Sequence, residues 1–364
     1  MEFKGSTSTV RDLLLARVDE TSQPGARTDD AHVVLAVEGG GMRGAVSSGM
    51  LLALEQMGFR SAFDEVVGTS AGAIAGAFFV TGRGTAGSLL YYTVLNSERF
   101  LDRTRLIRQG SIMDLDYLIG EAMEAHGFRW EEVISSDIPL WATVSPVDPD
   151  DGQSMFRVAR DAEHAKAVLT ASAALPVIAG PSREVDGRLY IDGGMTEAVP
   201  WDAALRRGAT HVLVARSRGY NRDYKPEELN PFERVTVPRL VRRMHGDYAT
   251  EVVNRSAERF WNSTESLRAV IEGRSTPITA QGQAVAIDAV LPSAEADLPD
   301  RLELDTHVLM DALTDGARAM IEYLDLDGFG VEQRVVVTHP RAPVGRFRTD
   351  ALAPIVRDRR HSPR

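Results

Sequence analysis

Hydrophobic residues along this chain occur either in short continuous runs or in longer stretches with helical spacing. The short runs predict strands at residues 32–37, 65–67, 140–144, 189–191, 211–215 and 284–289. The helical spacing predicts helices at residues 8–20, 45–57, 71–80, 162–171, 201–206, 237–261 and 306–324. Strands that alternate with helices are typical of a parallel sheet with helices on its faces. We therefore predict an α/β fold with three α/β/α layers around a mostly parallel central sheet, followed by a largely helical C-terminal extension.

Polar and loop-forming stretches divide this pattern into four regions. Residues 1–30 are predicted to form an N-terminal helix and a linker, and residues 31–215 an α/β domain. Residues 216–334 are predicted to form an α-rich extension packed on that domain. Residues 335–364, rich in Pro and Arg, are predicted to be a loose basic tail.

Composition and charge narrow the class of protein. Hydrophobic residues make up 43% of the chain and charged residues 26%, as in an ordinary soluble protein. The formal net charge of -11 argues against a general nucleic-acid binder. The absence of cysteine excludes disulfides, thiolate zinc sites and a cysteine nucleophile. The start has no signal-peptide pattern and no run reaches 18 apolar residues, so we expect a cytoplasmic protein.

A serine lies between two glycines where the second predicted strand ends and a helix begins. The segment reads Gly68-Thr69-Ser70-Ala71-Gly72. In a Gly-x-Ser-x-Gly turn the serine lies on a strained strand-to-helix elbow that exposes its hydroxyl. A glycine-rich turn with an incidental serine is also common in α/β proteins. Ser70 is therefore a candidate nucleophile whose interpretation depends on the other motifs.

A glycine-rich loop follows the first predicted strand and reads Glu38-Gly39-Gly40-Gly41-Met42-Arg43-Gly44. Its spacing fits G-x-G-x-x-G, which lets a dinucleotide pyrophosphate approach the backbone. The same geometry also suits an oxyanion hole, which directs backbone N–H groups at a developing negative charge. The dinucleotide interpretation requires an acidic residue at the end of the second strand, where this chain has the serine elbow. The oxyanion hole is favoured, and a loop that serves only close packing is the remaining alternative.

A third motif, Asp192-Gly193-Gly194, follows the strand predicted at residues 189–191. A serine hydroxyl attacks poorly unless a neighbouring group accepts its proton, and an aspartate within hydrogen-bond distance can do so. An isolated Asp-Gly-Gly is more often a plain turn. Its interpretation as a base depends on the serine elbow and the glycine loop.

Together and in this order, the three motifs resemble those of the patatin-like phospholipase family. Residues 39–44 resemble the family's oxyanion loop, residues 68–72 its nucleophile elbow and residues 192–194 its base motif. Residues 171–176 are similar to another recurrent stretch of these proteins, and residues 109–118 to a bacterial subgroup of them. The resemblance covers residues 31–215 closely and the region to about residue 330 loosely.

This resemblance implies a serine acyl hydrolase with Ser70 as nucleophile and Asp192 as general base, without a histidine, a metal, calcium or another cofactor. It implies an oxyanion hole at Gly40, Gly41 and Arg43. The motif glycines that it implies are Gly39, Gly44, Gly68, Gly72, Gly193 and Gly194. The expected substrate is a lipid acyl ester, cleaved in the manner of a phospholipase A, a lysophospholipase or an esterase.

The histidines of the chain bear on the choice between a dyad and a triad. A conventional hydrolase of this kind has a histidine after the acid in the chain. The candidates are His211, His245 and His307, and none lies in a glycine-flanked loop. We interpret them as structural or surface residues, which favours the dyad.

Two further expectations concern partners. The alternative to an enzyme is a non-hydrolytic patatin-fold module that binds an acyl ligand or a protein through its C-terminal half; the intact motifs argue against it. Basic clusters predict a transient contact with an anionic membrane surface, against the plain alternative of solvated faces. The clusters are Arg99, Arg103, Arg105 and Arg108; Arg239, Arg242 and Arg243; and Arg357, Arg359 and Arg360. Headgroup, acyl-chain length, regiospecificity and oligomeric state are not indicated by the sequence.

Overall fold

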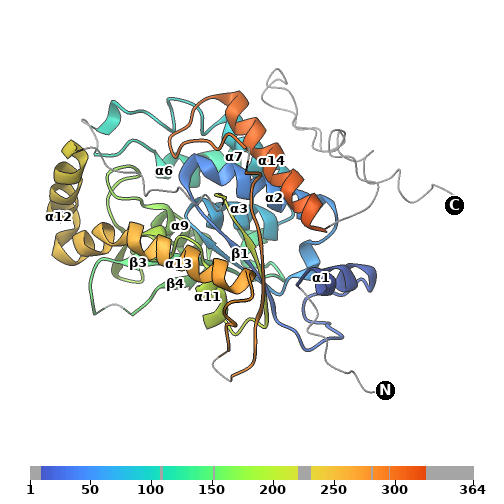
Figure 1. Cartoon of the computed structure of the whole chain (residues 1–364). Helices are drawn as coiled ribbons and strands as arrows, with labels where there is room; N and C mark the ends of the chain where they lie inside the picture. The colour runs from blue at the N-terminus through green and yellow to red at the C-terminus, as the bar shows by residue number, and fades with distance from the viewer. Residues whose placement is uncertain are drawn as a thin grey trace.

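The structure is a computed structural model that describes residues 10–106, 110–150, 152–219, 231–279, 282–294 and 296–324, with the backbone alone at 231–237. Figure 1 shows a central sheet with helices on both sides of it. Arg108 and the predicted tail, with Arg357, Arg359 and Arg360, lie outside the described residues.

An eight-stranded sheet forms the middle layer, with the order β5-β6-β3-β2-β1-β7-β8 and β4 paired to β3. Its strands are β1 (Val33–Val37), β2 (Glu65–Thr69), β3 (Leu140–Pro146), β4 (Met155–Arg157), β5 (Arg183–Val185), β6 (Arg188–Asp192), β7 (His211–Ala215) and β8 (Ala286–Val290). The five strands from β3 to β8 along this order run parallel, whereas β4, β5 and β6 add antiparallel pairs. This confirms the mostly parallel sheet predicted from the sequence.

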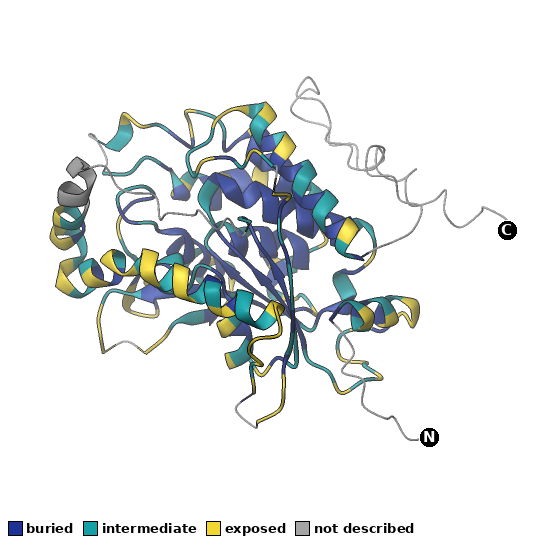
Figure 2. Cartoon of the chain, viewed as in Figure 1, coloured by how far each residue is buried: buried dark blue, intermediate teal, exposed yellow. Residues whose placement is uncertain are grey.

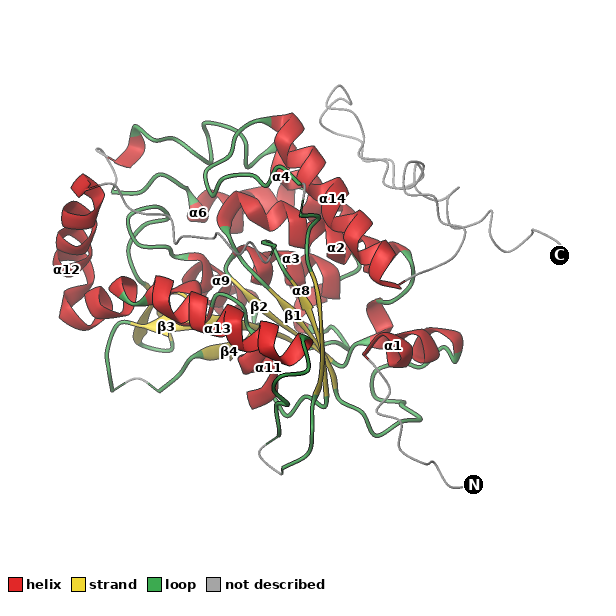
Figure 3. Cartoon of the chain, viewed as in Figure 1, coloured by secondary structure: helices red, strands yellow, loops and turns green. Residues whose placement is uncertain are grey.

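Helices cover both faces of the sheet (Figure 3). They are α1 (Val10–Asp19), α2 (Gly44–Gln56), α3 (Ala71–Val80), α4 (Gly84–Thr93), α6 (Leu115–Tyr117), α7 (Met123–Ala125), α8 (Trp130–Ile134), α9 (Ala162–Ala173), α10 (Gly194–Glu197), α11 (Trp201–Arg206), α12 (Pro231–Asn254), α13 (Ser256–Ile271) and α14 (Thr306–Leu324). Short turns of helix are η1 (Gly41–Arg43), η2 (Arg60–Ala62) and η3 (Leu118–Ala122). The helical C-terminal region predicted from the sequence is confirmed.

The strand β1 shows why the molecule has three layers. All five of its residues are buried, and successive side chains point to opposite faces of the sheet. Val33, Leu35 and Val37 join the larger core under α2, α3 and α14. Val34 and Ala36 join the second core with residues of α11 and α13. Figure 2 shows the sheet buried between these layers, with the outer side of α13 exposed.

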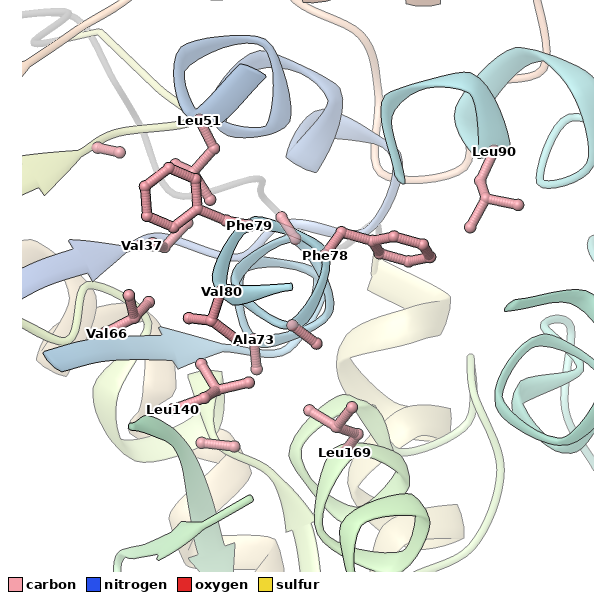
Figure 4. Close-up of a cluster of buried hydrophobic side chains, with 14 of the residues drawn as sticks. Val37, Leu51, Val66, Ala73, Phe78, Phe79, Val80, Leu90, Leu140 and Leu169 are labelled. Atoms are coloured by element: carbon pink, nitrogen blue, oxygen red, sulfur yellow. The ribbon is translucent and has the colours of Figure 1, made fainter. Parts of the chain in front are cut away.

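Helix α3 is buried on nearly every side, which explains its Ala, Gly and Phe composition. Figure 4 shows Phe79 and Val80 packed near the sheet residues Val37 and Val66, while Phe78 points towards Leu90 of α4. Phe78 also packs against Gly87 of α4. The region after residue 215 contributes to the same body, because β8 pairs with β7 and α14 packs along α2. The predicted division of the chain into domains stays a prediction.

The prediction of a single helix over residues 237–261 is wrong. The structure has two helices there, α12 and α13, and α12 itself is kinked at Gly246, whose φ of 84° and ψ of -176° are not helical. Sequence analysis also missed α4, the short helices α6 to α8, and strands β4 and β5. These elements are short, or begin with glycine as α4 does, so that their hydrophobic spacing is weak.

Replacing Arg17 with methionine is expected to lower the free energy of unfolding by about 3 to 5 kcal/mol, the usual loss when one partner of a buried ion pair is removed. The Arg17 side chain is 1% exposed and forms ion pairs with Asp29 at 2.7 Å and Asp64 at 2.8 Å. It also donates to the carbonyl oxygens of Ala62 and Ala31, so it fixes α1 to the core.

Urea unfolding of the two proteins measures the difference. The matched control is Arg255→Met, because Arg255 forms only exposed ion pairs and its loss is expected to change stability by less than about 0.5 kcal/mol. An Arg17→Met protein as stable as the Arg255→Met control would contradict the proposed anchoring of α1.

Candidate active site

Ser70 lies on the sharp turn between β2 and α3, at the carboxyl edge of the parallel strands. Its φ of 55° and ψ of -126° are unusual for a residue with a side chain and cost on the order of 1 to 3 kcal/mol. The flanking glycines permit the turn: a Cβ on Gly72 would overlap the carbonyl oxygen of Val37, and one on Gly68 the backbone of Ala73. The backbone therefore has the geometry of a nucleophile elbow.

Asp192 ends β6 and lies beside Ser70 across β3, since Val144 of β3 is the register partner of Asp192. The Ser70 hydroxyl donates a hydrogen bond to Asp192 Oδ2 over 2.7 Å. Asp192 Oδ1 accepts a second bond from the Gly194 N–H, also over 2.7 Å. Asp192 is 4% exposed, and both of its carboxylate oxygens accept hydrogen bonds from within the protein.

The surroundings of Asp192 change the pKa of its carboxyl group. Burial raises the pKa of Asp192 to about 6, while the hydrogen bonds from Ser70 and Gly194 and the positive charge of Arg301 act to lower it. A carboxylate with its usual pKa accepts a proton poorly, and a raised pKa brings it closer to the operating pH of a general base.

Residues 172–174 bond to the backbone of both Ser70 and the Asp192 motif, and sequence analysis assigned no role to them. The Ser70 N–H donates to Ser172 Oγ over 3.0 Å, and the Ser172 carbonyl accepts from the Gly193 N–H over 3.1 Å. The Asp192 N–H donates to the Ala174 carbonyl over 3.0 Å. The only signal for this segment was its similarity to a recurrent stretch of the resembled family.

The glycine loop follows β1 and lies against the elbow, because a Cβ on Gly39 would meet Ser70 Cβ at 3.0 Å. Gly40 and Gly41 have φ angles of 149° and 61°, conformations that favour glycine. Among the described residues, their N–H groups have no protein acceptor. The Arg43 N–H, in contrast, donates to the Gly40 carbonyl over 3.3 Å within the loop.

The remaining motif glycines lie at close contacts around these groups. Gly44 opens α2 beside the Tyr91 hydroxyl, and Gly193 packs against Thr143 of β3. The structure thus places the serine elbow, the glycine loop and the aspartate motif together at one edge of the sheet, although 122 positions separate Ser70 from Asp192.

A narrow apolar cavity of about 60 Å³ opens at Ser70. Its wall is formed mainly by aliphatic and aromatic side chains, of which the principal ones are Ile74, Phe78, Leu90, Leu95, Phe100, Met113, Leu115, Leu118 and Leu175. Asp192 and Arg301 are its charged residues. The arrangement suits an acyl group whose carbonyl carbon lies at Ser70.

Arg301 is a site residue that sequence analysis missed. It lies in the loop between β8 and α14, and its carbonyl accepts a hydrogen bond from the Met42 N–H of the glycine loop over 3.1 Å. A Cβ on Gly41 would meet the Arg301 carbonyl and its Cγ. The C-terminal region therefore contributes directly to the wall of the site.

None of the candidate histidines lines this cavity. His211 lies at the amino end of β7, bonded to Thr210 Oγ1. His245 is in α12, and His307 is exposed at the start of α14. In the described part of the chain, no group of three or more His, Asp or Glu side chains is arranged to hold a metal ion.

Of the basic clusters, the first is largely paired within the protein: Arg99 and Arg105 both face Asp114, at 2.9 and 3.9 Å. Arg242 in α12 forms an exposed pair with Asp247. Along the described residues, none of the helices combines the length and the apolar composition that crossing a membrane requires.

Comparison with known proteins agrees with this arrangement. A family model described as patatin-like phospholipase matches residues 35–205, which include the serine, the aspartate and the glycine loop. The resemblance of the sequence motifs is thereby confirmed.

Three relatives are similar to parts of the chain. A protein named YjjU from Escherichia coli is 28% identical over 215 residues, 56% of this chain and 57% of that protein. Patatin-like phospholipase domain-containing protein 7 from Rattus norvegicus is 30% identical over 50% of this chain and 13% of its own length. An NTE family protein from Mycobacterium bovis is 30% identical over 46% of this chain and 44% of its own. This chain therefore spans less than two thirds of each relative.

Proposed function

Because residues 35–205 belong to the patatin-like phospholipase family, we propose that this protein is a lipid acyl hydrolase that cleaves carboxylic esters with Ser70 and Asp192. The observation that carries the proposal is the 2.7 Å hydrogen bond from the Ser70 hydroxyl to Asp192, on a strained elbow at the end of an apolar cavity. A strained serine bonded to a buried carboxylate is the arrangement that a serine nucleophile and its base require.

In the proposed first step, Asp192 accepts the Ser70 proton while Oγ attacks the ester carbonyl carbon. The N–H groups of Gly40 and Gly41 stabilise the oxyanion that forms. Arg43 is less suited to this role than the sequence suggested, because its N–H is engaged within the loop.

When the tetrahedral intermediate collapses, the ester C–O bond breaks and Asp192 returns the proton to the leaving alcohol. Asp192 then accepts a proton from water, and the hydroxide attacks the acyl-enzyme. In the second collapse the bond between the acyl carbon and Ser70 Oγ breaks and Asp192 returns the proton to Oγ, which releases the carboxylic acid and restores the Ser70 hydroxyl. The purified protein is therefore expected to hydrolyse p-nitrophenyl butyrate. If the protein binds fatty acyl groups but hydrolyses no ester, the alternative of a non-hydrolytic binding module is favoured instead.

Short acyl esters are expected to be hydrolysed faster than long ones. The cavity of about 60 Å³ is much smaller than the roughly 300 to 1,000 Å³ of pockets that enclose drug-sized ligands. A long chain fits only if the lining side chains separate, which loses packing contacts. Comparing kcat/KM for p-nitrophenyl acetate, butyrate, octanoate and palmitate in one detergent measures this. A steady rise up to palmitate would contradict the expectation.

The pH dependence of hydrolysis is expected to reflect Asp192. The carboxylate must be ionised to accept the proton, and its pKa in the free protein is about 6, so kcat/KM should fall as the pH decreases through about 6. The positive charge of Arg301 lowers this pKa. Arg301→Gln should therefore shift the acidic limb of the profile to higher pH. If the acidic limb of the pH profile does not shift in Arg301→Gln, then Arg301 does not lower the pKa of Asp192.

A transient contact with an anionic membrane stays a prediction. In the first basic cluster, the pairing of Arg99 and Arg105 with Asp114 reduces the charge that could face lipid. Arg103, Arg239 and Arg243 are exposed and are the described residues that best fit such a contact. Flotation with anionic and neutral vesicles tests it.

A further inference from the structure

Ser217, which lies outside the residues matched by the family model, forms hydrogen bonds to the glycine loop. Ser217 follows β7 and is fully buried. Its hydroxyl donates a hydrogen bond to the Gly39 carbonyl oxygen over 2.7 Å. Its own N–H donates to Glu38 Oε2 over 3.0 Å. Ser217 thus contacts the loop on both sides of the peptide bond that precedes Gly39.

This contact bears on the direction of the Gly40 N–H. In a planar trans peptide the C=O and the N–H point to opposite sides, and the described chain contains no cis peptide. Fixing the Gly39 carbonyl therefore also fixes the Gly40 N–H. The adjoining Gly40 has φ 149°, a conformation available to a flexible glycine among many others. A contact from outside the loop is therefore needed to favour this conformation of Gly40 over the others.

The backbone around Ser217 is itself fixed to β1 by further hydrogen bonds. Glu38 Oε2 accepts from Arg216 Nε over 2.6 Å, and both side chains are buried. The Glu38 N–H bonds to the Ala215 carbonyl over 3.0 Å, which continues the pairing of β1 with β7. The end of β7 is therefore locked to the end of β1, and Ser217 has a fixed position relative to Gly39.

We propose that Ser217 is a positioning residue for the oxyanion hole: its hydroxyl holds the Gly39–Gly40 peptide so that the Gly40 N–H is directed at the oxyanion before substrate binds. The inference rests on the proposed hydrolase function. It gives the segment after β7, which lies outside the match to the family model, a part in the chemistry.

Two variants of Ser217 separate the hydrogen bond from the space that the side chain fills. Ser217→Ala removes both the donor and some volume, whereas Ser217→Cys still fills the space, with a somewhat larger sulfur atom, and replaces a strong donor with a weak one. Removing one oxyanion donor lowers kcat by about 100- to 1,000-fold, and misdirecting one should lower it by about 10- to 100-fold. We expect this loss in Ser217→Ala and a substantial loss in Ser217→Cys, with KM for p-nitrophenyl butyrate unchanged.

The matched control is Ser136→Ala, which removes another serine-to-carbonyl hydrogen bond, to Val80 over 3.0 Å at the far end of α3. It should lower the thermal midpoint by an amount similar to Ser217→Ala and leave kcat unchanged. The acidic limb of the pH profile should stay in place in both Ser217 variants, because Asp192 is untouched.

The outcomes distinguish the inference from the function on which it rests. If the unmodified protein hydrolyses no ester, the proposed function fails. If it does, and Ser217→Ala keeps full kcat, the inference is wrong. Full kcat in Ser217→Cys with loss in Ser217→Ala would also overturn it, because filled space would then matter and the hydrogen bond would not. Should Ser217→Ala fail to fold, the Cys variant alone decides the question.

Discussion

Replacing Ser70 with alanine is expected to abolish ester hydrolysis, with kcat reduced by at least about 10⁴-fold, because loss of the nucleophile leaves only binding and oxyanion stabilisation. The fold should survive, since the substitution removes a single oxygen atom and the side-chain hydrogen bond that this atom donates to Asp192. A hydrogen bond to a charged group contributes about 1.5 to 3 kcal/mol. Rates with p-nitrophenyl butyrate and thermal melts of both proteins measure the two effects.

Ser136→Ala serves as the control here as well, because it removes a serine hydroxyl away from the cavity. It should retain full activity. A folded Ser70→Ala protein with activity close to the unmodified protein would mean that the hydrolysis has another nucleophile, and the assignment of Ser70 would be lost.

Asp192→Asn is expected to lower kcat by about 10²- to 10⁴-fold, the range that a general base contributes. The amide has nearly the same shape, and its oxygen can still accept the Gly194 N–H, but it cannot take the serine proton. The pKa of Asp192 is about 6 in the folded protein, above its unfolded value, so the ionised carboxylate destabilises the fold as the pH rises through about 4 to 6. The variant should therefore melt at a higher temperature at pH 7.

Asp186→Asn is the matched control. Asp186 lies on the turn before β6, where it pairs with Arg160 at the surface. This change should leave both kcat and its pH profile unaltered. Equal kcat in Asp192→Asn and Asp186→Asn would show that another group accepts the proton.

Much of the fold could be predicted because the hydrophobic pattern of each segment matches the burial of that segment in the folded protein. Helix α3 and strand β7 were predicted with the observed boundaries, since β7 is a short continuous apolar run and α3 a longer apolar stretch rich in alanine and glycine. The boundaries of the helix predicted at residues 237–261 were wrong. A single glycine, Gly246, changes the direction of the chain there, while the polar pattern of the sequence continues. Backbone geometry of that kind leaves no periodic signal.

The candidate site was predictable to the extent that its parts carry glycine motifs. Ser70, Asp192 and the loop at residues 39–44 each lie at a strand end marked by glycine. The parallel strands β1 and β2 bring the loop and Ser70 to one edge of the sheet, whereas Asp192 ends β6, which runs antiparallel to β3. Ser172, Ser217 and Arg301 act through single hydrogen bonds or charges formed across long sequence distances. A lone serine or arginine in a loop has no spacing that would distinguish it.

Covalent labelling with a fluorophosphonate tests most directly whether Ser70 is a nucleophile that Asp192 activates. Mass spectrometry of the digested protein should find one adduct on the peptide that contains Ser70. The adduct should be absent in Ser70→Ala and form at least tenfold more slowly in Asp192→Asn. An active protein that remains unlabelled at Ser70, or is labelled on another serine, would contradict the account.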